Sequence, residues 1–217
     1  MNDAHPIPVA SYVQQLQRWP DIGRHILAHF DDETIVVYQA YRPAIGSFAA
    51  QHGYFGGDFK YTRMSWIKPD FLWMMYRSDW GRSSGQEVTL AIRLRRTYFD
   101  SLLKQAVSSS FGSSDSKNHD DWKTAVDRSD VRLQWDPDHL PNGDKCERRA
   151  IQLGLRGEAL DAYGKREAIE IIDMSDFVAE QRANLDDWKS GALMTPCESV
   201  YVPTDATIAK HVCLDVE

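Results

Sequence analysis

The spacing of strand-like segments constrains the fold of this chain more than any other feature. Segments rich in β-branched and aromatic residues predict strands. They are residues 34–38, 87–94, 131–135, 150–155 and 168–172. Patterns typical of helices occupy residues 43–51, 69–76, 98–107, 120–128, 157–163 and 175–185. Because strands and helices do not alternate regularly as βαβ units, the sequence predicts an α+β fold with a mixed or mostly antiparallel sheet and packed helices.

Both ends of the chain look like additions to a central domain. Residues 9–18 carry apolar side chains at helical spacing, Pro20 ends this pattern, and residues 21–30 predict a second short helix. No regular pattern continues after Ser190. The expected organisation is an N-terminal helical extension (1–22), a single α+β domain (23–189) and an irregular C-terminal tail (190–217).

Charge and apolar content limit the classes of partner. The 217 residues carry a formal net charge of −7, which argues against bulk binding to nucleic acid but leaves room for a local basic patch. The longest apolar run has six residues, at 71–76, whereas a membrane-spanning helix needs about 20. Residues 1–8 lack the features of a secretory signal. Three widely spaced cysteines form no CxxC pair, so we expect reduced thiols in a cytoplasmic protein without a membrane partner.

Residues 59–82 combine aromatic and basic side chains. This stretch holds seven aromatic and five basic residues, and its local charge is +3. Aromatic faces suit planar bases, and cations suit phosphates. The candidate binding residues here are Arg63, Trp66, Lys68, Tyr76 and Arg77. The alternative is that the aromatic residues belong to the core and the basic side chains extend past them to solvent.

Arg77 is expected to make the strongest single contact in such a site. It follows six apolar residues, so its guanidinium should be held in place. In the competing interpretation, Arg77 pairs with an internal carboxylate, such as Asp79 or Asp136.

Two further segments place polar groups next to predicted strands. Gln39, Tyr41 and Arg42 lie where a strand meets a helix N-terminus, a position that favours phosphate, although a plain strand end is an alternative. Gln152 lies in an otherwise apolar strand, where it either braces the core or faces a site. Glu158 is a candidate acid or only a carboxylate that favours a helix dipole.

Metal chemistry has little support in the sequence. His25 and His29 have the i, i+4 spacing of a metal pair on a helix, but no third ligand accompanies them. No nucleotide-binding P-loop, GxGxxG, GxSxG or HExxH motif occurs. We therefore expect no metal.

Four segments together resemble one known family. They are Thr34-Ile-Val-Val-Tyr-Gln-Ala-Tyr41, Arg63-Met-Ser-Trp-Ile-Lys-Pro-Asp-Phe-Leu-Trp-Met-Met-Tyr-Arg-Ser78, Leu133-Gln-Trp-Asp-Pro137 and Arg149-Ala-Ile-Gln-Leu-Gly-Leu155. The resemblance is to the domain-of-unknown-function family 4291 and covers about residues 23–178. The family name carries no activity, so it leaves the function open.

The start of the central domain is also similar to the ADP-ribosyltransferase superfamily. There, a strand with a polar residue leads into a helix that ends near a Gly-aromatic pair. Residues 35–39, the helix at 43–51 and Gly53-Tyr-Phe55 resemble this order. A later strand of the superfamily supplies a Glu or Gln, and Gln152 is the matching candidate. The resemblance implies an ADP-ribosyltransferase-like fold with NAD as its substrate.

The resulting primary hypothesis is an enzyme that transfers ADP-ribose from NAD to a nucleotide or nucleic acid, through an oxocarbenium-like state. An aromatic residue would clamp the nicotinamide, a cation would hold the pyrophosphate, and a Gln or Glu would bind the ribose hydroxyls. Its catalytic candidates are Gln152, Tyr41 and Glu158. Its cofactor-binding candidates are Gln39, Arg42, Arg63, Trp66, Lys68, Tyr76 and Arg77.

Two other functions stay open at this point. One is a non-catalytic module that binds a nucleotide-like anion, RNA or DNA through residues 59–82. The other is an interaction protein without a small ligand. A steep salt dependence of RNA binding would favour the module, and nicotinamide release would favour the enzyme.

Overall fold

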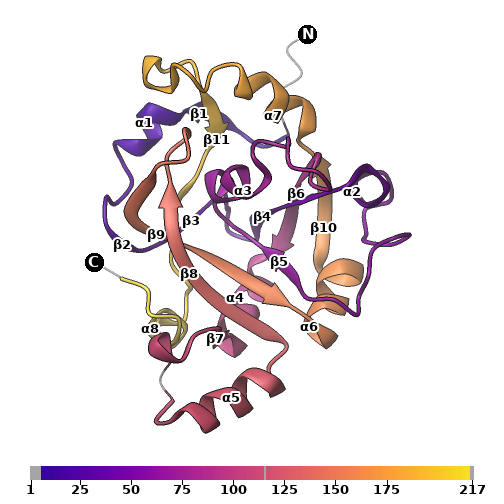
Figure 1. Ribbon diagram of the computed structural model, residues 1–217, viewed down its shortest axis with the longest axis vertical. Helices are drawn as coiled ribbons and strands as arrows, with labels where there is room; N and C mark the ends of the chain where they lie inside the picture. The colour runs from indigo at the N-terminus through magenta and orange to yellow at the C-terminus, as the bar shows by residue number, and fades with distance from the viewer. Residues whose placement is uncertain (1–5, 115, 216–217) are drawn as a thin grey trace.

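Two sheets form the centre of the molecule (Figure 1). The computed structural model describes residues 6–114 and 116–215. The first sheet has the antiparallel order β10-β6-β4, from β4 (Thr34–Tyr41), β6 (Val88–Arg95) and β10 (Ala168–Asp173). The second is built on the antiparallel hairpin of β8 (Val131–His139) and β9 (Lys145–Leu155). These strands include all five that the sequence predicts.

Three short strands complete the second sheet. Strand β5 (Ser65–Ile67) pairs antiparallel with the C-terminal end of β9. The parallel strands β2 (Gly23–Arg24) and β7 (Val107–Ser108) pair with β9 and β8, respectively. The mostly antiparallel sheets and the helices around them confirm the predicted α+β class.

Helices form where the sequence patterns predict them. They are α2 (Pro43–His52), α3 (Phe71–Ser78), α4 (Arg96–Gln105), α5 (His119–Arg128), α6 (Gly157–Ala162) and α7 (Ser175–Arg182). Pro43 suits the first turn of α2, and Gly53 ends that helix in the left-handed conformation at φ 74°. Asp70 caps α3 by accepting a hydrogen bond from the Trp73 amide.

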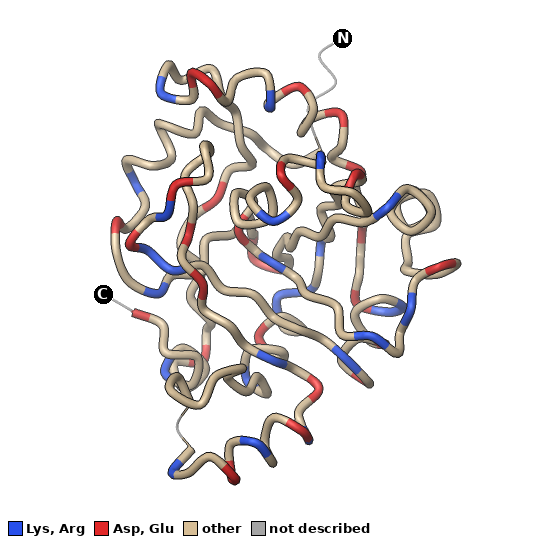
Figure 2. The backbone as a smooth tube through the Cα atoms, in the orientation of Figure 1, with Lys and Arg blue, Asp and Glu red and all other residues tan. Residues whose placement is uncertain are grey.

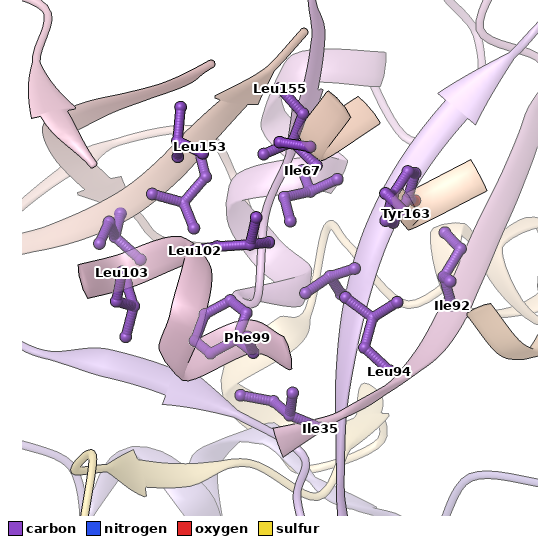
Figure 3. Packing of buried hydrophobic residues seen from close by; sticks show 14 of the residues in the cluster. Ile35, Ile67, Ile92, Leu94, Phe99, Leu102, Leu103, Leu153, Leu155 and Tyr163 are labelled. Carbon is purple, nitrogen blue, oxygen red and sulfur yellow. The ribbon is translucent and has the colours of Figure 1, made fainter. Parts of the chain in front are cut away.

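The largest apolar cluster lies between the two sheets. Helix α4 contributes Phe99, Leu102 and Leu103, which lie near Leu153 and Leu155 of β9 (Figure 3). A second cluster packs α3 against the other face of β4. Helix α3 therefore lies beside both sheets and contacts β4 and β8.

Of the predictions for the two ends of the chain, only a short helix within residues 9–18 is confirmed. Residues 9–18 form β1 (Val9–Ser11) and a short α1 (Tyr12–Leu16). The second predicted helix is replaced by β2 and β3 (Ile26–Ala28).

The tail is not irregular either. It contains β11 (Met194–Pro196), β12 (Ser199–Tyr201) and α8 (Ala206–His211). Strand β1 pairs with β11, and β3 pairs with β12. Because each partner is remote in sequence, local patterns could not reveal these pairs. Residues 1–5 and 216–217 of the predicted end segments lie outside the described residues.

Charged residues of both signs are interspersed along the backbone (Figure 2). Within the described part of the chain, no helix has the length and apolar character needed to cross a membrane.

Candidate functional site

A groove runs along the C-terminal end of β4 and the segment that leads into β5. It consists of two adjoining cavities of about 380 and 480 Å³, which share Tyr41, Arg63, Met64 and Ser65 in their walls. We call it the β4–β5 groove. It brings together six of the residues predicted from sequence: Gln39, Tyr41, Arg42, Arg63, Trp66 and Lys68.

A buried hydrogen-bond network builds the wall of the β4–β5 groove. The Tyr163 hydroxyl donates to Gln39 Oε1 at 2.7 Å. Gln39 Nε2 donates to Ser65 Oγ at 2.9 Å and to the Trp66 carbonyl at 3.0 Å. The Tyr41 hydroxyl lies 2.6 Å from Ser65 Oγ, and burial raises the pKa of Tyr41. The amide of Gln39 is thus engaged inside the protein, and Tyr41 presents a neutral hydroxyl.

Lys68 brings an unpaired positive charge to this groove. Its side chain is buried, with 5% of the residue exposed, and it lines the smaller of the two cavities. We find no hydrogen-bond or ion-pair partner for Nζ among the residues described. Burial, with the nearby charge of Arg77, lowers the pKa of Lys68 to about 8, and Asp136 acts in the opposite direction. An ammonium in this environment favours an anion from solution.

Arg77 is a second cation near Lys68 and lies on α3. The two carboxylates proposed as its partners are engaged elsewhere. Asp79 pairs with Arg82 at 2.7 Å, and Asp136 accepts hydrogen bonds from two glutamines. In residues 6–114 and 116–215, the Arg77 guanidinium has no ion-pair partner within 4.0 Å.

The face of the β8–β9 hairpin that points away from the apolar core is polar. Gln134 and Gln152 lie directly opposite each other on β8 and β9. Their Nε2 atoms donate to the two oxygens of Asp136, at 2.8 and 2.7 Å. Gln152 therefore faces away from the core, in which its neighbours Ile151 and Leu153 are buried.

Gly154 allows Trp66 to lie close to this polar face. Trp66 pairs with Gly154 in the β5–β9 register. A Cβ at Gly154 would come within 3.0 Å of the Trp66 ring and 2.8 Å of Met64 Sδ. The glycine thus makes room for an aromatic side chain that is half-buried and lines the groove.

Sequence reasoning missed Gln134 and Asp136 as site residues. Their signal was the alternation with Val131 and Leu133, which are buried in the core. In a strand, this period of two places Gln134 and Asp136 on the face opposite the core.

Four predicted residues do not line the β4–β5 groove: Gln152, Arg77, Tyr76 and Glu158. Tyr76 stacks on His139, with ring centroids 3.5 Å apart, and lines a separate cavity of about 630 Å³. Glu158 lies at the start of α6, and its exposed carboxylate pairs with Arg166 at 2.9 Å. Arg42 lines the groove, but its charge is partly balanced by Asp58 at 2.8 Å.

The His25–His29 pair does not lie on the predicted helix. His25 Nε2 lies 3.0 Å from the Ile22 carbonyl oxygen, and His29 Nδ1 lies 2.9 Å from that of Cys197. Across the described ranges, no group of three or more His, Cys, Asp or Glu is arranged to hold a metal ion.

Fold and site together define an α+β protein with two central sheets and a groove in which Lys68 has no ion-pair partner among the described residues. The chain belongs to the family described as Domain of unknown function (DUF4291), whose family model matches residues 25–201. This match confirms the family resemblance seen in the sequence. No curated protein matches the chain.

Proposed function

We propose that the β4–β5 groove binds a nucleotide-like anion. The single observation that carries this proposal is the buried Lys68 side chain in the wall of the groove, with no carboxylate within 4.0 Å of its ammonium in the described structure. A buried, unpaired charge is unfavourable, and a phosphate group would compensate it.

The surroundings of Lys68 favour a nucleotide over a simple inorganic ion. Arg77 adds a planar guanidinium that suits bidentate phosphate binding. Trp66 and Tyr41 supply aromatic surface in the walls of the same groove. Phosphates would lie at the cations and a planar ring at the aromatic surface, because bases stack on such faces.

Our proposal for the reaction is transfer of ADP-ribose from NAD. The strand–helix–Gly-aromatic order of the superfamily resemblance is present as β4, α2 and Phe55, and the Phe55 ring packs on Tyr41 at a centroid distance of 5.7 Å. The glycosidic bond to nicotinamide would break with its electron pair leaving on the nicotinamide. The acceptor would then bond to C1′ and release its proton to solvent. Glu158 lies away from this groove, so the carboxylate whose charge would favour the positive charge on the sugar is Asp136, which acts at a distance because both its oxygens are held by glutamines.

Isothermal titration calorimetry with NAD, ADP-ribose and a short RNA tests the binding proposal. We expect heat from NAD or ADP-ribose with the wild-type chain, and a smaller signal with Lys68→Met. The absence of heat with every one of these ligands would overturn the nucleotide site.

A nicotinamide-release assay tests the reaction separately. Release from NAD supports the enzyme. Binding without release under any acceptor condition would reduce the proposal to a nucleotide-binding module. RNA binding that weakens steeply with salt would identify nucleic acid as the ligand of that module.

A further inference from the structure

We propose that Asp136 is a positioning residue that orients the carbonyl oxygens of Gln134 and Gln152 toward the hydroxyl groups of a ribose. This inference rests on the proposed function, because it assigns the sugar of the same nucleotide-like ligand. It goes further by assigning the residues that make the site selective for ribose over deoxyribose.

The hydrogen bonds of Asp136 fix which way the two amides face. A carboxylate only accepts hydrogen bonds, and both oxygens of Asp136 receive an Nε2–H group. The amide nitrogen of each glutamine is therefore directed at Asp136, and each Oε1 must point elsewhere. Neither Oε1 has a hydrogen-bond partner among the described residues, and both glutamines are half-buried.

The strand register places Gln152 near Lys68. Ile67, the last paired residue of β5, pairs with Leu153, and Lys68 follows it toward Gln152, on the same face of the strand as Trp66 by alternation. Gln134 is the partner of Gln152 on β8. The charge of Asp136, which holds both glutamine amides, acts to raise the pKa of Lys68.

The amide oxygens of Gln134 and Gln152 together select a ligand that carries two neighbouring hydrogen-bond donors. Carbonyl oxygens accept hydrogen bonds and do not bind phosphate. Side chains at directly opposed positions of two antiparallel strands start about 5 Å apart at Cβ. The two oxygens can therefore accept hydrogen bonds from the adjacent 2′- and 3′-hydroxyls of a ribose whose phosphate lies at Lys68. A deoxyribose would leave one acceptor unpaired.

Titration calorimetry with ADP, 2′-deoxy-ADP and inorganic pyrophosphate tests this inference. We expect the wild-type chain to bind ADP roughly tenfold more tightly than 2′-deoxy-ADP, as for one lost hydrogen bond to an acceptor left unpaired. In Asp136→Asn, one side-chain oxygen becomes an NH₂ donor, so one glutamine amide must turn over. That variant should bind ADP and 2′-deoxy-ADP equally, with pyrophosphate affinity kept.

Asp79→Asn is the matched control, because Asp79 is an exposed aspartate that pairs with Arg82 outside the groove. It should keep the wild-type preference for ADP. Equal wild-type affinities for ADP and 2′-deoxy-ADP, or a preserved preference in Asp136→Asn, would overturn the inference while the anion site stands. Failure of both ADP and pyrophosphate to bind would overturn the site and the inference together.

Discussion

Lys68 and Tyr38 exchange two backbone hydrogen bonds, with N–O distances of 2.6 Å from the Tyr38 amide and 3.2 Å from the Lys68 amide. This bridge joins the end of β5 to β4, and so connects the two sheets. It holds the backbone of Lys68 rigidly while the side chain extends to the groove. An unpaired ammonium is therefore maintained at a fixed place, where it opposes stability in the absence of an anion.

Replacing Lys68 should separate function from stability. In Lys68→Met we expect a more stable protein without ligand at pH 7 and a loss of anion binding, because the variant buries an apolar chain in place of a charge. Thermal melts together with calorimetry on ADP-ribose measure both effects. Lys104→Met, an exposed lysine of α4, should change neither. A less stable Lys68→Met protein would indicate a structural role instead.

The pH dependence of the free energy of unfolding tests whether the pKa of Lys68 is lowered in the fold. Its pKa is lowered from 10.5 to about 8 in the folded protein. The unfolded chain therefore binds more protons between pH 8 and 10.5, and the contribution of Lys68 to stability rises with pH in this window. Urea unfolding of the wild-type chain should show this rise relative to Lys68→Met. A constant difference between the two proteins from pH 7.5 to 10 would contradict it.

Arg77 should contribute to binding more than to stability. We expect Arg77→Ala to weaken binding of a nucleotide-like anion by roughly 1.5–3 kcal/mol, the range for a charged hydrogen bond. Arg77→Lys should restore this only in part, since an ammonium lacks the planar fork. Arg82→Ala is the control, because Arg82 already pairs with Asp79. Calorimetry and melts on all three variants check this, and a lower melting temperature of Arg77→Ala with unchanged affinity would speak against it.

Local patterns sufficed for the central domain but not for its recognition chemistry. The β-branched run in β4 and the Pro43 start of α2 are properties of neighbouring residues, so the sequence predicts them directly. The same holds for the aromatic and basic composition around Lys68. The position of Asp136 between two glutamines instead depends on the pairing of β8 with β9, and on which face of the hairpin is buried.

Glu158 and Tyr76, which are predicted in the site but lie outside the groove, also show that distance along the chain does not give position in the fold. Glu158 and Gln152 are six positions apart, yet β9 ends between them, so the two side chains lie on different elements. Tyr76 and Arg77 are adjacent, but successive helical residues point in different directions. Tyr76 therefore packs on His139, whereas Arg77 lies near Lys68.

Gly154 should tolerate no side chain. Because its Cβ would lie 2.8 Å from Met64 Sδ and 3.0 Å from the Trp66 ring, we expect Gly154→Ala to displace Trp66. Such overpacking costs about 1–3 kcal/mol of unfolding free energy. Urea unfolding and tryptophan fluorescence measure the two effects. Gly112→Ala is the control, since a Cβ there meets nothing within 4 Å. Equal stabilities of the two variants would show that the Trp66 side of the groove is pliable.

Asp70, the N-cap of α3, is buried near two other carboxylates, those of Asp138 and Glu198. Asp138 is ionised and forms an ion pair with Arg148, whereas Glu198 accepts a hydrogen bond from the Phe71 amide. Burial, and then the charge of Asp138, raises the pKa of Asp70 from 3.8 to about 8.

Because the pKa of Asp70 is raised, the folded protein binds more protons than the unfolded chain between pH 4 and 8. The contribution of Asp70 to the free energy of unfolding is therefore fully present below pH 4 and is lost as the pH rises to about 8. Asp70→Asn keeps an N-cap acceptor without a charge. We therefore expect it to gain stability over the wild-type chain progressively from pH 5 to 8, by an amount on the order of a few kcal/mol, at about 1.4 kcal/mol per pKa unit. Asp205→Asn, at the exposed N-cap of α8, should show no such trend, because the pKa of Asp205 is lowered by its hydrogen bonds to Thr207. Thermal melts of the three proteins from pH 5 to 8 measure these differences in stability. Parallel pH profiles of wild type and Asp70→Asn would mean that Asp70 is already ionised in the folded protein.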